Sequence, residues 1–489
     1  MKYFGLKNLG LSIAAFAALA GLSTTPTYAQ ADEQFATTQA ATSVDVTVYG
    51  EGFGQVEEQR QVKLSAGKNR IQLNGIAAKY RQDSLSIIST AGPGDFKFKS
   101  ATYQPANLTA ERVLELSVGK QVTATVGSGA SARQVTGTLV SVRGGQVIIT
   151  AGDTTNVAAT GDIQLGKLAE GLSNSASLVI EAEVTSAGTY TLNYLYETDG
   201  LGWNAKHTLV YSEEKKALES FRTTVNVVNA SGASFDNANL WLLSGSVRPA
   251  PGGVRFRAAA AEYAAAPPVA DAAAVESVGE RKVFRIPGKV TIGDGQSRQL
   301  PLFSGANVAV EHEYFVPAQQ YYGEPSNGFS PVSARLKLKN CSEHNLGTPL
   351  PGGAVKVLQR NSEGKLQLTA NASIREVAKD EQFDIAIGTS SDVKFDRVLA
   401  KASAVTANPS VRLRPNQQAP EYQDQEFEVK IHNFKDKKAV DVLVEVAVPA
   451  EQDNLAPLTR KNATTATGTV HVEPGKDGSL RYTLRVRTN

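Results

Sequence analysis

Apolar and polar residues alternate along much of this 489-residue chain, with the period of two that is typical of half-buried strands. The pattern is densest between Tyr190 and Gly245, where we predict four strands separated by three turns. The loop 199–204, which contains two glycines and Trp203, is predicted to turn the chain between the first two strands. This stretch predicts the core of an antiparallel sheet.

The same alternation continues to the C-terminus. The segment 440–448 places five valines on one face, and burial of each contributes roughly 1.5–3 kcal/mol, which predicts a core strand. The last strand, at 480–487, is charged on one face only, as expected of a sandwich strand with one side in water. The clearest helix is predicted at 105–118, where Asn107 or Thr109 can cap the start and Gly119 can end it.

Residues 119–165 predict a separate small unit. Glycines separate five short strands, at 121–126, 134–139, 140–142, 146–150 and 156–165. The pattern resembles small SH3-like or Sm-like barrels, with a bent strand that starts near Gly137. Any small antiparallel barrel would show the same pattern.

These elements together predict an all-β protein of several antiparallel, Ig-like β-sandwich domains, with a small SH3-like barrel and one short helix. The predicted divisions are a signal peptide at 1–31, a polar linker at 32–42, an N-terminal β domain at 43–104, the helix at 105–118, the small barrel at 119–168, a central β domain at 169–248, a flexible Ala/Pro-rich insertion at 249–280, strands completing the central domain at 281–325 and a C-terminal sandwich at 326–489.

The N-terminus has the features of an export signal. Lys2 and Lys7 precede a short apolar run at 11–22, and the small residues at 29–31 form a cleavage site. We therefore expect an exported protein, periplasmic or extracellular, with no later membrane-spanning helix. The single cysteine, Cys341, excludes an intramolecular disulfide and lies too far from the signal for an N-terminal lipid anchor.

Charge is balanced, with 50 Lys and Arg against 48 Asp and Glu. Removal of the signal takes two lysines with it and leaves 48 of each sign. Such a balance gives no reason to expect a nucleic acid or an anionic membrane surface as partner.

Several motifs resemble an exported bacterial family defined by a domain of unknown function, the group that includes a mucoidy inhibitor. The stretches that carry the resemblance are 194–196 (Tyr-Leu-Tyr) to 202–204 (Gly-Trp-Asn), 226–232 (Asn-Val-Val-Asn-Ala-Ser-Gly), 238–245 (Ala-Asn-Leu-Trp-Leu-Leu-Ser-Gly), 346–353 (Leu-Gly-Thr-Pro-Leu-Pro-Gly-Gly) and 427–436 (Phe-Glu-Val-Lys-Ile-His-Asn-Phe-Lys-Asp). The resemblance implies a multi-domain β protein of the cell envelope and implies no activity. Some relatives carry a coiled coil in the N-terminal half, where this chain has only a short helix.

Candidate chemistry is sparse. Cys341 and His344 could supply two metal ligands, but a structural zinc site needs four. On a strand, the side chain of His312 would point to one face and those of Glu311 and Glu313 to the other, so the three would not converge. The glycines at 50–54 lack the Lys and Ser/Thr of a phosphate loop. We therefore expect no catalytic residue, no cofactor and no metal.

Exposed aromatic residues offer a candidate interaction surface, formed by Tyr321, Tyr322 and Trp203. Tyr321 and Tyr322 lie in a Gln/Pro/Gly-rich loop, whereas Trp203, like Trp241, has core filling as its alternative role. The expected function is non-catalytic binding or scaffolding, with an unknown envelope protein or glycan as partner. Two alternatives stay open: a carbohydrate-active or peptide-cleaving hydrolase whose carboxylates meet only in three dimensions, and a self-assembling envelope subunit that pairs its strand edges.

Overall fold

The computed structural model describes residues 34–50, 52–166, 172–245, 274–318, 329–405, 421–450 and 452–487. Within these residues the chain forms thirty strands, one α-helix and three short 3-10 turns. The predicted all-β class, with several sheets and one short helix, is therefore confirmed. The predicted signal peptide lies outside the described residues. No helix in the described ranges is long and apolar enough to cross a membrane.

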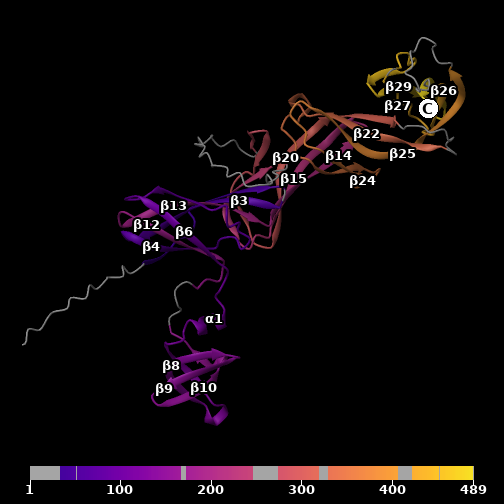
Figure 1. Cartoon of the computed structure of the whole chain (residues 1–489). Helices are drawn as coiled ribbons and strands as arrows, with labels where there is room; N and C mark the ends of the chain where they lie inside the picture. Colours follow the sequence, from indigo (N-terminus) through magenta and orange to yellow (C-terminus); the bar gives the residue numbers. More distant parts are fainter. Residues whose placement is uncertain are drawn as a thin grey trace, which may run out of the picture.

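Sheets I and II form the N-terminal half of the fold (Figure 1) and share a core to which sheet IV also contributes. Sheet I has the order β1 (Gln34–Thr37), β4 (Gly67–Asn74), β12 (Ser177–Val184), β6 (Phe96–Gln104). Sheet II has the order β17 (Ala274–Val278), β18 (Arg281–Arg285), β16 (Phe235–Leu243), β2 (Ser43–Tyr49), β3 (Phe53–Leu64), β13 (Gly188–Asp199), β5 (Ser86–Ala91), and β19 (Val290–Ile292) pairs with β16.

Two further sheets form the C-terminal half. Sheet IV has the order β20 (Gln296–Ala309), β15 (Ala217–Asn229), β14 (Leu201–Ser212), β23 (Gly353–Arg360), β24 (Leu366–Ile374). Sheet V has the order β28 (Thr459–Asn462), β29 (Thr465–Val472), β27 (Val440–Ala447), β21 (Glu311–Val316), β22 (Ser330–Lys339), β25 (Gln382–Val405), β26 (Tyr422–Asn433), β30 (Asp477–Arg487). One core lies between sheets IV and V, and sheet V encloses another. The five valines predicted to be buried at 440–448 are all at most 5% exposed.

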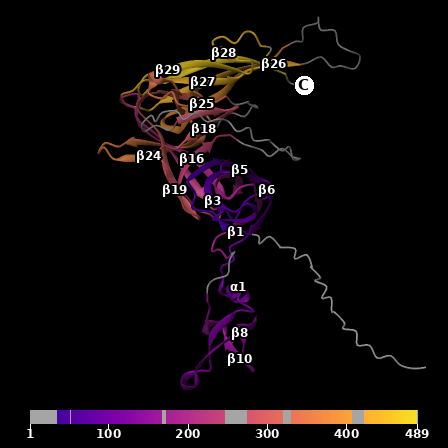
Figure 2. The same cartoon turned by 90° about the vertical axis from the view of Figure 1, so that its left-hand side faces the viewer.

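The small unit is sheet III, with the order β10 (Thr154–Ala159), β9 (Gln146–Ala151), β8 (Arg133–Arg143), β7 (Gln121–Val126), β11 (Ile163–Gln164). It lies apart from the other sheets in both views, beyond α1 (Ala110–Glu115) (Figures 1 and 2). Its sheet is open, since β10 and β11 are its edges. The predicted bent strand is β8, whose register with β9 shifts between Leu139 and Ser141. The helix is shorter than predicted, and Thr109 caps it by accepting a hydrogen bond from the backbone N–H of Arg112 at 3.2 Å.

Strand direction differs from the prediction. The sequence predicts antiparallel sheets, but four strand pairs are parallel: β1 with β4, β2 with β16, β14 with β23, and β21 with β27. In each pair the partners are separated by other strands in the sequence, so no hairpin dictates their direction. Alternation of apolar residues has the same period in both arrangements and therefore could not distinguish them.

Hydrogen bonding crosses the predicted domain limits. Sheet II combines strands from the predicted N-terminal and central domains, and sheet IV combines β14, β15 and β20 with β23 and β24 from the region 326–489. Two segments predicted to lack structure contain strands. Residues 34–37 of the predicted linker form β1, and residues 274–278 of the predicted flexible insertion form β17. The preceding residues of that insertion, 249–273, lie outside the described residues.

The predicted turn at 199–204 is also wrong, because the chain does not reverse there. β13 ends at Asp199 in sheet II and β14 begins at Leu201 in sheet IV, so only Gly200 separates them. Gly200 has φ +88°, its N–H donates to Gly52 at 2.8 Å, and its carbonyl accepts from Ala230 at 2.8 Å. A left-handed glycine lets the chain leave one sheet and enter the next.

We expect Gly200→Ala to destabilise the fold by about 3 kcal/mol or more, because the left-handed backbone disfavours a Cβ and that Cβ would overlap the Ala230 carbonyl. Gly75→Ala is the matched control, since Gly75 has φ +82° and nothing within 4 Å of an added Cβ. It should cost about 1 kcal/mol. Urea unfolding of both variants measures the difference, and equal losses would contradict the role given to Gly200.

Candidate functional site

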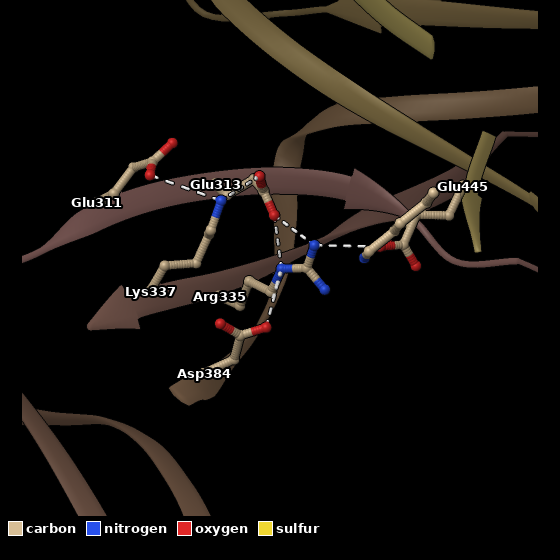
Figure 3. Close-up of polar contacts among 7 residues, drawn as sticks. Glu311, Glu313, Arg335, Lys337, Asp384 and Glu445 are labelled. Atoms are coloured by element: carbon tan, nitrogen blue, oxygen red, sulfur yellow. Dashed lines mark hydrogen bonds and ion pairs between the residues drawn. The ribbon is translucent and has the colours of Figure 1, made fainter. Parts of the chain in front are cut away.

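A groove of about 800 Å³ opens where the end of β24 meets sheet V. Ser373, Ile374 and Arg375 line it on the sheet IV side. Charged residues of sheet V line the other side, and with their neighbours they form an ion-pair network (Figure 3). The members of this Arg335 network are Glu311, Glu313, Arg335, Lys337, Asp384, Glu445 and Lys461.

Arg335 is the centre of the network. Its Nε donates to Oε2 of Glu313 at 2.6 Å, and its Nη2 lies 3.2 Å from Oε1 of Glu445. Asp384 is more distant, with Oδ2 3.6 Å from Nε. The guanidinium also lies over the ring of Phe315, 4.2 Å from its centroid. The side chains of Arg335, Glu313 and Glu445 are only 13–14% exposed, so these bonds are shielded from solvent.

Strand register brings these charges together. In the antiparallel pair β21 and β22, Glu313 lies directly opposite Arg335 and Glu311 lies opposite Lys337. Residues two apart on a strand share a face, so two opposite-charge pairs form side by side. β27 runs parallel to β21 and supplies Glu445, and Lys461 comes from β28.

Counter-charges keep the two central cations protonated. Burial alone would lower the pKa of Arg335, but the hydrogen bonds and charges of Glu313 and Glu445 outweigh it, so this pKa lies above its ordinary value. Burial also opposes the charge of Lys337, and Glu313 and Glu311 likewise raise the pKa of its ammonium group. Arg335 and Lys337 therefore both carry a positive charge across the physiological range.

The network contains three cations and four carboxylates, but only two of the carboxylates lie within hydrogen-bonding distance of the cations. Within 3.2 Å, Glu313 is shared by Arg335 and Lys337, and Glu445 is shared by Arg335 and Lys461. Three cations thus share two carboxylates at hydrogen-bonding distance, while Glu311 and Asp384 approach only to 3.6 Å. Lys337 and Lys461 are 39% and 52% exposed, so both retain N–H groups that solvent or a ligand can reach.

Of the predicted interaction surface only Trp203 lies in the described residues, and it does not line this groove. Trp203 lies on strand β14, and the expectation that it lies in a loop is wrong. Its half-buried ring packs edge-on to Phe284 with centroids 6.1 Å apart, and its Nε1 donates to the Leu243 carbonyl at 3.1 Å. Core filling accounts for these contacts. Tyr321 and Tyr322 lie outside the described residues.

The remaining candidate ligands stay separate. Cys341 is buried and His344 ends a 3-10 turn, and no group of three or more His, Cys, Asp or Glu side chains in the described ranges is placed to hold a metal ion. His312 stacks on Tyr211 with centroids 6.2 Å apart, whereas the neighbouring Glu313 joins the Arg335 network.

Sequence reasoning did not single out the Arg335 network. A signal was present in Glu311-His312-Glu313 and Arg335-Leu336-Lys337, whose opposite charges alternate at the same spacing on two strands. If the strands that contain residues 311–313 and 335–337 had been paired, the bonds from Arg335 and Lys337 to Glu313 would have been predicted. No local pattern indicates that Glu445 and Lys461 join the same network.

Comparison with known proteins adds no identification. No protein-family model matches the sequence, and no curated protein is detectably similar to it. The resemblance to the mucoidy-inhibitor group therefore stays an expectation from the motifs quoted above.

We expect Arg335→Met to destabilise the protein by about 3 kcal/mol, because it leaves the shielded carboxylates of Glu313 and Glu445 without their shared partner. Lys461→Met, at a half-exposed member of the same network, should cost less than about 1 kcal/mol. Urea unfolding measures both. An Arg335→Met loss no larger than that of the control would show that the network contributes little to stability.

A second expectation concerns His207, a fully buried residue of β14. Its Nε2 donates to the Pro351 carbonyl at 3.0 Å and its Nδ1 lies 2.9 Å from Oγ1 of Thr223. Burial lowers the pKa of His207 from 6.5 to about 4, against the opposing effect of the Pro351 bond.

Because this pKa is lower in the folded state, the neutral ring favours folding above pH 6.5, and this contribution is lost as pH falls through about 4. Over this range the free energy of unfolding falls by about 3 kcal/mol. We expect His207→Gln to remove this part of the acid sensitivity in urea unfolding between pH 7 and 4, whereas His471→Gln, at an exposed histidine, should leave it in place. An unchanged slope in His207→Gln would contradict the assignment.

Proposed function

We propose that this protein is exported and acts in the cell envelope as a non-catalytic binding or scaffolding protein. Its ligand would carry carboxylate groups and bind in the groove beside Arg335. The export part rests on the predicted signal at 1–31. The binding part rests on the groove and its charges.

The observation that carries the proposal is the exposure of two ammonium groups, those of Lys337 and Lys461, at the groove. Lys337 and Lys461 lie on either side of Arg335, each with one close carboxylate partner and with exposed N–H groups. Carboxylates of a ligand can accept charge-assisted hydrogen bonds from these lysines without breaking the bonds of Arg335. A volume of about 800 Å³ is within the usual range for ligand sites.

The hydrolase alternative has less support. Glu313 and Asp384 both line the groove, and glycosidases use two carboxyl groups that flank the scissile bond. Here the guanidinium of Arg335 lies between them and contacts both (Figure 3). Both oxygens of Glu313 already accept hydrogen bonds, one from Arg335 and the other from Lys337. This arrangement leaves no room for a substrate bond between the two carboxylates.

Calorimetric titration of the mature chain, residues 32–489, tests the binding part with three probes: hexaglutamate, hexagalacturonate and hexalysine. We expect at least one acidic probe to bind, more weakly as salt rises, and hexalysine not to bind. The acidic probe that binds identifies a peptide or a glycan as the carboxylate source.

Lys337→Gln combined with Lys461→Gln should weaken that binding at least about tenfold, the equivalent of one lost charge-assisted hydrogen bond. Lys99→Gln combined with Lys215→Gln removes two exposed, ion-paired lysines elsewhere and is the matched control. Equal affinity in the two double variants, or no binding of either acidic probe, would refute the groove as the site. Cell fractionation tests export, which a cytoplasmic chain that retains residues 1–31 would contradict.

A further inference from the structure

Two carboxylates beside the groove are held loosely. Oδ2 of Asp384 lies 3.6 Å from Nε of Arg335, which is beyond hydrogen-bonding distance. Oε2 of Glu311 lies equally far, at 3.6 Å, from Nζ of Lys337. The side chains of Asp384 and Glu311 are 50% and 69% exposed, whereas the two carboxylates bonded to Arg335 are 13% and 14% exposed. Exposed ion pairs contribute little to stability, so either loose carboxylate can turn away from its cation at little cost.

Strand pairing places both of these carboxylates on the strands that flank Lys337. In the sheet order β21, β22, β25, Glu311 lies opposite Lys337 on one side and Asp384 lies opposite it on the other. Paired residues share a face of the sheet, so Lys337 has an exposed carboxylate on each neighbouring strand (Figure 3). An anion that approaches Lys337 in the groove therefore meets two internal competitors.

The two exposed lysines of the network contact different parts of a ligand. Nζ of Lys337 lies 3.2 Å from Glu313, and Nζ of Lys461 lies 3.2 Å from Glu445. Arg335 binds both of these carboxylates and so lies between them. One ligand carboxylate therefore bonds to only one of the two lysines, and a ligand that contacts both needs carboxylates at two positions.

We propose that the groove selects ligands with several carboxylates along a linear chain, and that Glu311 and Asp384 enforce this selection. In this structure the two side chains are internal counter-ions, and carboxylates of the ligand replace them beside Lys337 and Arg335. The bonds of Arg335 to its shielded carboxylates are kept. This inference rests on the proposed binding function and names the class of ligand that the same site takes.

The selection follows from the balance of this exchange. A monoacid that replaces one internal carboxylate exchanges one weak ion pair for another and gains little affinity. Once the first carboxylate of a polyacid has bound, the next is held near the remaining cations at a high effective concentration. Internal competitors therefore reject ligands that offer a single carboxylate and admit those that offer several.

Calorimetric titration of the mature chain with hexaglutamate and hexagalacturonate tests the role of the internal carboxylates. Glu311→Gln combined with Asp384→Asn should bind the acidic probe at least about threefold more tightly, because no loose carboxylate then competes for the cations. Glu115→Gln combined with Glu183→Gln removes two exposed, ion-paired carboxylates elsewhere and is the control for net charge. It should bind like the wild type. Equal affinity in the two double variants would overturn the role given to Glu311 and Asp384.

A second titration tests the selection itself with probes that carry one carboxylate, N-acetylglutamate α-amide and galacturonate. We expect the monomer of the acidic probe that binds to bind the wild-type chain more than about tenfold more weakly than its hexamer, because it cannot contact both lysines. A difference of about tenfold or less, which the larger number of carboxylates in the hexamer alone can give, would overturn the selection for polyacids.

The results separate this inference from the proposed function. If the wild-type chain binds a hexamer and Glu311→Gln with Asp384→Asn binds it no more tightly, the groove remains the site and only this inference fails. If neither chain binds a hexamer, both fail. If only the double variant binds, the internal carboxylates close the groove to acidic ligands, which supports this inference and contradicts binding by the wild type.

Discussion

One continuous run of inward-facing side chains, from Tyr190 to Tyr211, holds the main body together. Tyr190, Leu192, Tyr194 and Tyr196 on β13 fill the core shared by sheets I, II and IV. Leu209 and Tyr211 on β14 belong to the core between sheets IV and V. Because Gly200 carries the chain between these sheets without a loop, the two cores are joined by consecutive strands. The relative placement of these sheets therefore depends on the burial of this one 22-residue segment, whose apolar face makes both contacts.

The first core contains charges, and they differ from those at the groove. Glu58 is 4% exposed and accepts hydrogen bonds from Nε and Nη2 of Arg60, two residues along the same strand, at 2.8 and 2.6 Å. The hydroxyl of Tyr196 donates to its other oxygen at 3.3 Å. This pair is largely enclosed, since the side chains of Arg60 and Glu58 are 13% and 5% exposed. The Arg335 network has the same kind of shielded centre but ends in two lysines that reach solvent. These exposed lysines make the Arg335 network a candidate binding site, whereas the pair of Glu58 and Arg60 is structural.

The sequence pattern predicts the individual strands of this fold but not the pairing of strands that are distant in the chain. The alternating valines of 440–448 predict a buried strand correctly, because each valine needs only its own neighbours to define a face. The same valines do not reveal that β27 runs parallel to β21, since that pairing joins segments more than a hundred residues apart. Gly200 shows the same limit, because a glycine between two strands is equally compatible with a hairpin and with passage into another sheet. The Arg335 site depends on five strands at once, so sequence reasoning could have predicted only the contacts between the paired strands β21 and β22, such as that of Glu313.

The groove lies where it does for a physical reason. Inside a sandwich, the inner face of each sheet is filled by its partner, and the outer face is flat and exposed. A concave polar surface arises where two sheets diverge, and sheets IV and V diverge at the end of β24. Leu366 and Leu368 are exposed for a different reason, because the register shift at Thr369 turns them to the face opposite Ala370 and Ala372, which pack against the core.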